Sequence, residues 1–153
     1  MRLDQFLVTV HILAAATWIG VALALQVIAR RMDVSTDPAV TDRFAQDAET
    51  IGKTLLGPAA AMLMVSGVIL VAHEHLGWTR AWILTGLVAV AIAGAVGGTF
   101  LIPEGRRIAE LARTPGHDPD EVRRRAARRF LIARVDLVVL IVGVADMVFR
   151  PGR

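Results

Sequence analysis

The sequence contains neither cysteine nor tyrosine among its 153 residues. The lack of cysteine excludes disulfides, thiolate metal sites and cysteine nucleophiles, and the lack of tyrosine excludes tyrosyl acid–base chemistry. Motifs such as HExxH and CxxCH are also missing, as are motifs for nucleotide or nucleic-acid binding. These absences favour a protein that is not an enzyme and that does not bind nucleic acid.

Charged side chains are missing from three long stretches of the chain. The stretches lie between Asp4 and Arg30 (25 residues), between Lys53 and Glu74 (20 residues) and between Arg80 and Glu104 (23 residues). A helix needs about 20 apolar residues to cross the hydrocarbon core, where the backbone has no water to bind. We therefore expect a transmembrane helix in each stretch.

A fourth apolar run, from Phe130 to Phe149, has a comparable length but carries Arg134, Asp136 and Asp146. With this run included, the sequence predicts an all-α polytopic membrane protein with a single membrane domain over residues 1–153. We expect a four-transmembrane-helix bundle with spans at about 5–29, 55–76, 80–102 and 130–149. Short cytoplasmic helical extensions are expected in the loops 30–54 and 103–129.

Positive charge is concentrated in these two loops, which hold 12 of the 17 lysine and arginine residues. The positive-inside rule places both loops in the cytoplasm and both termini outside. We therefore expect a multi-pass protein of the bacterial cytoplasmic (inner) membrane.

Two helix-start signals lie in the loops. Asp37-Pro38 and Asp118-Pro119 both read as an N-cap followed by proline at the first helical position. The first begins a helix over 38–52, and the second begins a rod from Pro119 to Val148, about 45 Å long at 1.5 Å per residue. We expect its arginines to lie against anionic head groups of the lipid bilayer, rather than to bind a cytoplasmic partner or nucleic acid. These arginines are Arg123, Arg124, Arg125, Arg128 and Arg129.

Small residues recur at every fourth position in two spans. They are Ala16, Gly20 and Ala24 in the first span, and Ala89, Ala93 and Gly97, with Gly94 and Gly98, in the third. This spacing lets helix backbones approach closely in lipid. We interpret it as packing within one bundle; the alternative is the face of a homo-oligomer. The segment GAVGG is also a candidate for an unwound stretch, although close packing explains it better.

Three polar side chains at similar depth near the outer face define the candidate site. His11 lies about 10 Å from the outer end of its span, His73 about 5 Å and Asp146 about 6 Å. Because neutral imidazole is a common ligand of both haem b and divalent metals, we expect His11 and His73 to be cofactor ligands. Trp18 is expected to wall a planar ligand. For a metal, Asp146 and His75 are further candidate ligands.

The same polar residues have other interpretations. They could form a hydrogen-bonded packing layer with no cofactor, or they could handle protons or a substrate. In the inner layer, Asp136 is either half of a structural ion pair or part of a transport path that also uses Asp146.

Four short segments resemble a known family: HILAAATWIG, GPAAAMLMVSGVIL, FLIPEGRRI and MVFRP. Together they resemble a bacterial family of small, uncharacterised four-helix integral membrane proteins, over nearly the whole chain. The start of the first span is also similar to copper-resistance D-type proteins and to membrane protoporphyrinogen oxidases, which bind haem. These resemblances imply a cofactor role for His11 and for no other residue.

The leading interpretation is therefore a small haem- or metal-binding membrane protein that transfers electrons or handles a cofactor. Two alternatives stay open: a cofactor-free structural or accessory membrane subunit, and a small-solute or ion transporter. A visible absorption spectrum would separate the first from the other two. The transporter requires an aqueous path that joins Asp136 and Asp146.

Overall fold

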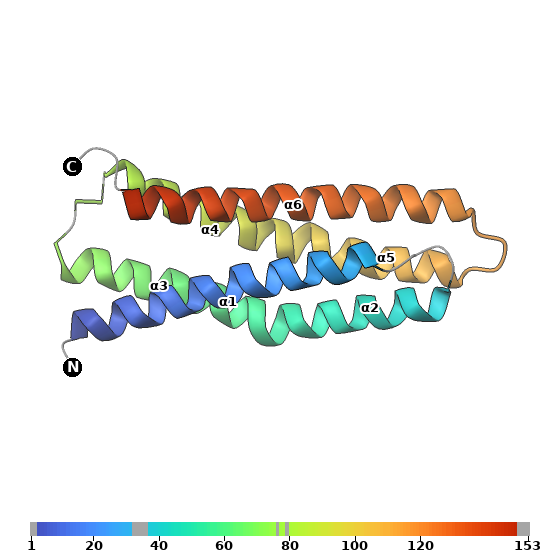
Figure 1. The fold of residues 1–153 in the computed structure, drawn as a ribbon, viewed down its shortest axis with the longest axis horizontal. Coiled ribbons are helices and arrows are strands. Elements are labelled where there is room, and N and C mark those ends of the chain that lie inside the picture. Colours follow the sequence, from blue (N-terminus) through green and yellow to red (C-terminus); the bar gives the residue numbers. More distant parts are fainter. Residues whose placement is uncertain (1–2, 32–36, 76, 79, 150–153) are drawn as a thin grey trace.

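The computed structural model describes residues 3–31, 37–75, 77–78 and 80–149, and all regular structure within them is helical (Figure 1). The elements follow in the order α1 (Leu3–Arg31), α2 (Pro38–Ile51), η1 (Gly52–Leu56), α3 (Gly57–His73), α4 (Ala81–Val96), η2 (Gly97–Leu101), α5 (Ile102–Arg113) and α6 (Pro119–Phe149). Here η1 and η2 are single π-helical turns. An all-helical protein, as the sequence predicts, is confirmed for the described residues.

The helices form four rods, because each π-helical turn continues one helix directly into the next. The rods are α1, α2–η1–α3, α4–η2–α5 and α6. Three stretches within them are long and apolar enough to cross a membrane: Leu3–Arg31, Asp42–His73 and Ala81–Arg113. The apolar half of α6 is interrupted by Arg134, Asp136 and Asp146. A fourth span, and with it a four-transmembrane-helix bundle, stays a prediction.

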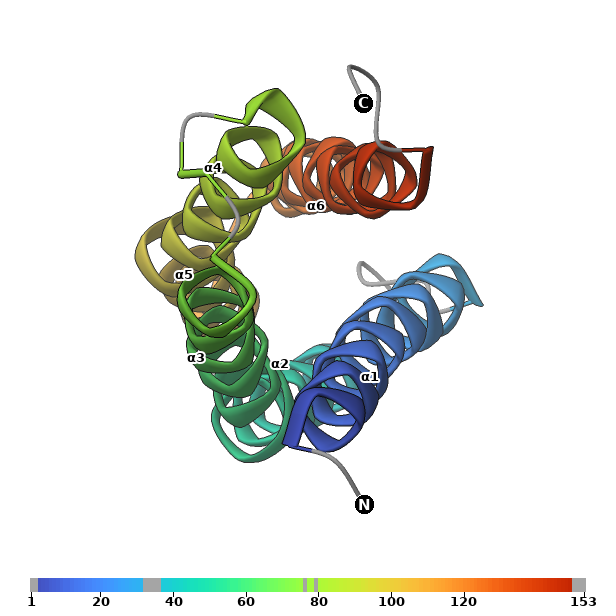
Figure 2. The same ribbon diagram turned by 90° about the vertical axis from the view of Figure 1, so that its left-hand side faces the viewer.

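The rods lie side by side on an arc, in chain order (Figure 2). α1 begins and α6 ends at the same end of the molecule, and α1 and α6 are well separated there (Figures 1 and 2). The opposite end holds α2, α5 and the first half of α6 (Figure 1). We call these the open end and the arginine-rich end.

Both π-helical turns lie just before a proline, Pro58 after η1 and Pro103 after η2. In η1 the N–H of Gly57 bonds to the carbonyl of Gly52, five residues back, and η2 repeats this pattern. Proline has no N–H, and in a regular α-helix its ring clashes with the carbonyl four residues earlier. A widened turn before the proline accommodates the ring without breaking the rod.

α1 and α3 run antiparallel and meet in layers that repeat every seven residues along both helices. The layers are Asp4 with His73, His11 with Ser66, and Trp18 with Ala59, which share a buried cluster. A seven-residue repeat is typical of helices that cross at a shallow, left-handed angle. The polar side chains of α1 are therefore directed at α3 by the same periodicity that directs its tryptophan into the core.

α4 packs against α6 through small residues. A Cβ atom added at Gly143 would lie only 2.9 Å from the Cβ atom of Ala89, and one added at Gly86 would overlap the Met147 methyl group. Ala93 is also buried, so the packing prediction is confirmed for the two alanines of α4. The prediction of close packing within the chain is wrong for four glycines, because a Cβ atom added there would meet nothing within 4 Å. They are Gly20, Gly94, Gly97 and Gly98.

At the arginine-rich end, α2, α5 and the start of α6 pack together. Ile108 and Ala112 of α5 bury themselves against Val122 of α6. Ion pairs join α5 to α2, between Arg106 and Glu49 and between Arg113 and Asp42. These contacts hold α2 against α5, and α5 against the start of α6.

Both predicted helix starts are confirmed. The Asp37 carboxylate accepts a hydrogen bond of 2.8 Å from the Ala39 N–H, and the Asp118 carboxylate accepts one of 2.9 Å from the Asp120 N–H. The rod that follows is a single helix of 31 residues. The cytoplasmic location of this end stays a prediction.

Candidate functional site

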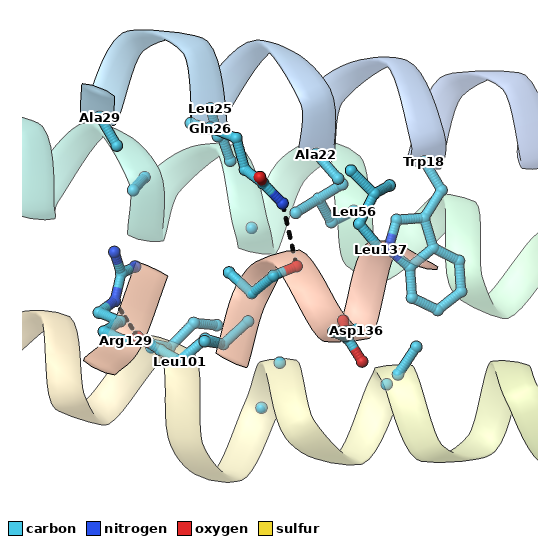
Figure 3. Close-up of a pocket in the computed structure, with 18 of the residues that line it drawn as sticks. Trp18, Ala22, Leu25, Gln26, Ala29, Leu56, Leu101, Arg129, Asp136 and Leu137 are labelled. Carbon is cyan, nitrogen blue, oxygen red and sulfur yellow. Dashed lines mark hydrogen bonds between the residues drawn. The ribbon is translucent and has the colours of Figure 1, made fainter. Parts of the chain in front are cut away.

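A cavity lies between the rods in the half of the molecule nearer the arginine-rich end. Its volume is about 270 Å³, just below the roughly 300–1,000 Å³ of pockets that take drug-sized ligands. α1, α6 and both π-helical turns contribute to its walls (Figure 3). Most of the lining side chains are apolar, and the polar ones are Gln26, Arg129 and Asp136. The cavity is therefore of a size for a small solute.

Gln26 and Arg129 both have protein partners. The Gln26 amide donates a 3.0 Å hydrogen bond to the Ala133 carbonyl, and Nε of Arg129 donates one of 2.9 Å to the Leu101 carbonyl. Each of these hydrogen bonds joins α6 to another rod across the cavity (Figure 3). Both side chains thus hold the cavity walls in position.

Asp136 differs from these two residues. Its Oδ1 atom is buried and, among the described residues, has no hydrogen-bond partner. Figure 3 shows the carboxylate directed from α6 toward α4, on the same cavity as the Trp18 ring. The ion pair that the sequence allowed for this carboxylate is not found among the described residues. A buried carboxylate oxygen that has no hydrogen-bond partner is a candidate ligand-binding group.

The glycines of α4 and η2 keep this space open. Gly94, Gly97 and Gly98 line the cavity, and a Cβ atom added at any of them would have no neighbour within 4 Å. The Trp18 side chain also lines the cavity and is itself only 6% exposed. The segment GAVGG is thus helical, ends in a π-helical turn and borders the cavity.

His11 lies outside the cavity lining and packs directly on α3. Its Nδ1 atom is 3.0 Å from the Ser66 hydroxyl, which itself donates a 2.6 Å hydrogen bond to the Met62 carbonyl. A Cβ atom added at Gly67 would lie 3.0 Å from the imidazole ring. The hydroxyl gives its one proton to the Met62 carbonyl, so its oxygen remains available as an acceptor for an Nδ1–H of His11.

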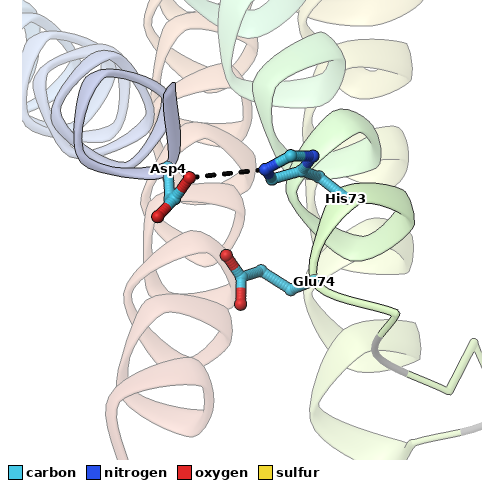
Figure 4. A group of neighbouring side chains, drawn as sticks. All are labelled: Asp4, His73 and Glu74. Atoms are coloured by element: carbon cyan, nitrogen blue, oxygen red, sulfur yellow. Dashed lines mark hydrogen bonds and ion pairs between the residues drawn. The ribbon is translucent and has the colours of Figure 1, made fainter. Parts of the chain in front are cut away.

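His73 has different partners, at the open end. Its Nε2 atom is 3.3 Å from Oδ1 of Asp4, and the Glu74 carboxylate lies beside them (Figure 4). Among the described residues, the group of neighbouring ligand atoms found here is Asp4, His73 and Glu74; His11 does not belong to it. Haem held by His11 and His73 stays a prediction.

The other two candidate metal ligands do not belong to the His73 group. Asp146 is on α6, one turn before its end, and His75 follows α3 with a backbone φ of 50°. The structure thus places His73 beside Asp4 and Glu74, and not beside the partners expected from the sequence. Asp4 lies seven residues before His11, and His73 lies seven residues after Ser66. Because the two helices are antiparallel, these equal spacings are the sequence signal that pairs Asp4 with His73.

The arginines of α6 divide their contacts between protein and solvent. Arg124 pairs with Asp118 at 3.3 Å, and Arg125 pairs with Glu121 at 3.0 Å and with Glu104 at 3.3 Å. The hydrogen bond to Glu121, with the charge of both carboxylates, raises the pKa of Arg125. Arg128 is exposed and is the better candidate for a lipid head group.

Comparison with known proteins places the chain by family. A family model described as a predicted integral membrane protein (DUF2269) matches residues 5–151. The chain belongs to this family. Membership of DUF2269 confirms the family resemblance and, with the apolar helices, an integral membrane protein. No curated protein and no solved structure matches the chain, so the similarity to copper-resistance D and protoporphyrinogen oxidase proteins is not supported.

Proposed function

We propose that this membrane protein binds a small organic cation, an amine with an apolar body, in the cavity beside Asp136. The observation that carries the proposal is the buried, unpartnered Oδ1 atom of Asp136 on an otherwise apolar cavity. An isolated carboxylate at low dielectric is unfavourable, and a bound cation supplies the missing partner. The apolar walls then remove the hydrocarbon part of the ligand from water.

Two further residues support a cation of small size. The Trp18 ring borders the same cavity, and the face of an indole ring attracts an ammonium group within about 6 Å of its centre. Arg129 lies seven residues before Asp136 on α6, about 10 Å along the helix. Its positive charge keeps the ammonium group at the Asp136 end of the cavity.

The cavity favours the transporter among the functions that the sequence left open. A cofactor-free structural subunit has no use for a buried carboxylate oxygen without a partner, whereas a carrier needs a polar group at depth that its solute satisfies. On this proposal Asp136 is the binding residue. Asp146, which does not line the cavity, is not needed for binding.

The test compares a charged probe with its neutral counterpart. We would titrate the protein in nanodiscs with benzylammonium and with benzyl alcohol, which share their apolar body and differ in charge, and follow binding by calorimetry. We expect benzylammonium to bind at least tenfold more tightly. We expect Asp136→Asn to lose this preference and Asp146→Asn to keep it, because only the first carboxylate lines the cavity.

A second variant tests the cavity itself. Gly97→Leu fills space in which an added Cβ atom meets no neighbour, so it should abolish binding while the protein remains folded. Equal binding of both probes, or a preference for the cation that survives Asp136→Asn, would refute the proposal. Uptake of radiolabelled benzylammonium into proteoliposomes then tests whether bound cation crosses the membrane.

A further inference from the structure

A second group of polar side chains lies at the open end, away from the cavity. Asp4 stands in the first turn of α1, His73 ends α3, and Glu74 follows it. One ligand atom from each of the three lies within 4.8 Å of the other two. Figure 4 shows both carboxylates directed toward the space beside the imidazole ring. Two helices that are distant in sequence therefore bring three metal-binding side chains together.

Among the described residues, no lysine or arginine forms an ion pair with this group. Among the ion pairs of the described residues, Asp4 pairs with His73 alone, and Glu74 has no pair with a lysine or an arginine. Two carboxylates beside one imidazole repel each other unless a cation lies between them. A divalent ion would remove that repulsion and use all three side chains.

The spacing of the atoms fits a transition metal. Zinc binds imidazole nitrogen and carboxylate oxygen at about 2.0–2.2 Å, which puts tetrahedral ligand atoms roughly 3.3–3.5 Å apart. Nε2 of His73 and Oδ1 of Asp4 are already 3.3 Å apart. Glu74 is exposed, so its side chain is free to rotate and complete the set.

We infer that Asp4, His73 and Glu74 bind a divalent transition metal such as Zn²⁺. One nitrogen and two oxygen ligands leave positions for water, and this mixed set favours zinc, manganese or iron over calcium or magnesium. The ion links the first turn of α1 to the end of α3, one seven-residue layer beyond the contact between His11 and Ser66. It thereby fastens α1, which packs mostly on α3, at the open end of the molecule.

The chain is well suited to a direct metal titration, because it has no cysteine and only four histidines. We would purify it with a tag that contains no histidine, reconstitute it in nanodiscs and titrate Zn²⁺ against a chromophoric chelator. We expect one equivalent to bind with micromolar affinity. We expect His73→Ala and Asp4→Asn each to weaken binding at least tenfold. Both side chains are more than 40% exposed, so these variants should fold.

Three matched variants serve as controls: His75→Ala, His117→Ala and Asp146→Asn. Each removes an imidazole or a carboxylate that lies outside the group, and each should bind Zn²⁺ as the wild type does. Zn²⁺ should also raise the melting temperature of the wild type but not of His73→Ala, because a ligand of the folded state stabilises it.

The inference is overturned if the chelator loads with Zn²⁺ in the presence of the protein as it does in its absence, or if His73→Ala binds the ion as tightly as the wild type does. Loss of binding in Asp146→Asn would also overturn it, in favour of the ligand set expected from the sequence. The result is separate from that for the cavity. Asp136→Asn should keep Zn²⁺ binding, and His73→Ala should keep benzylammonium binding.

Discussion

Nδ1 of His11 in α1 lies 3.0 Å from the hydroxyl of Ser66 in α3. The histidine at the start of the motif HILAAATWIG therefore connects two membrane helices. The contact lies between the layer of Asp4 and His73 and that of Trp18 and Ala59. It sets which face of α1 meets α3.

This contact predicts a measurable coupling between His11 and Ser66. In a double-mutant cycle of His11→Ala and Ser66→Ala, we expect a coupling free energy of about 0.6 kcal/mol, and no more than ~1.7 kcal/mol, as for other hydrogen bonds between membrane helices. The measurement is the free energy of unfolding in mixed micelles for the four proteins of the cycle. Strictly additive effects would contradict the contact.

Close packing of α4 on α6 predicts that Gly143→Ala is destabilising. The new Cβ atom would lie 2.9 Å from the Cβ atom of Ala89, and neither atom can move without its backbone. We expect a loss of about 1–3 kcal/mol in the free energy of unfolding. Gly20→Ala is the matched control, since its Cβ atom meets nothing within 4 Å. It should leave stability unchanged or raise it by up to ~1 kcal/mol. Equal losses in both variants would contradict the packing.

The natural lack of cysteine allows a clean test of the fourth span. Single cysteines at Pro115, in the exposed turn before α6, and at Phe149, which is 82% exposed at its end, would be labelled with a membrane-impermeant maleimide. We expect Phe149→Cys to react in intact cells and Pro115→Cys to react only after lysis, because positively charged loops stay in the cytoplasm. Labelling of both from one side would show that α6 does not cross the membrane.

The exposed arginine of α6 predicts a preference for anionic lipid. Arg128→Gln should weaken the binding of phosphatidylglycerol at this arginine by about fivefold, which corresponds to about 1 kcal/mol for one arginine near the surface. The measurement is the share of phosphatidylglycerol that co-purifies from mixed vesicles. High salt should remove the difference, because it screens exposed charges. A difference that persists in one molar salt would indicate a different kind of contact.

Much of the fold could be predicted because its signals are local. Charge-free runs predict three membrane helices, and Asp37 and Asp118, each followed by proline, predict where α2 and α6 begin. These signals depend on neighbours along the chain. They need no knowledge of which helix lies beside which.

The rotation of each helix about its axis is where sequence reasoning fell short. α4 is apolar on every side, so its pattern does not show which face is buried. Gly94 and Gly98 therefore looked like packing residues, although they border the cavity. The partners of His11 and His73 were missed for the same reason. Depth along a helix follows from counting residues, but direction depends on the neighbouring helix.

The two π-helical turns have a consequence for changes in chain length. Each residue advances a regular helix by about 100°, and a π-helical turn holds one residue more than an α-helical path requires. Deleting one residue from 52–56 or 97–101 would return that turn to regular winding and leave the residues beyond it facing the same way. The same deletion in a regular stretch would rotate everything beyond it by about 100°. Insertions and deletions in this family should therefore collect at these two turns, where the faces that line the cavity keep their direction and both rods stay continuous.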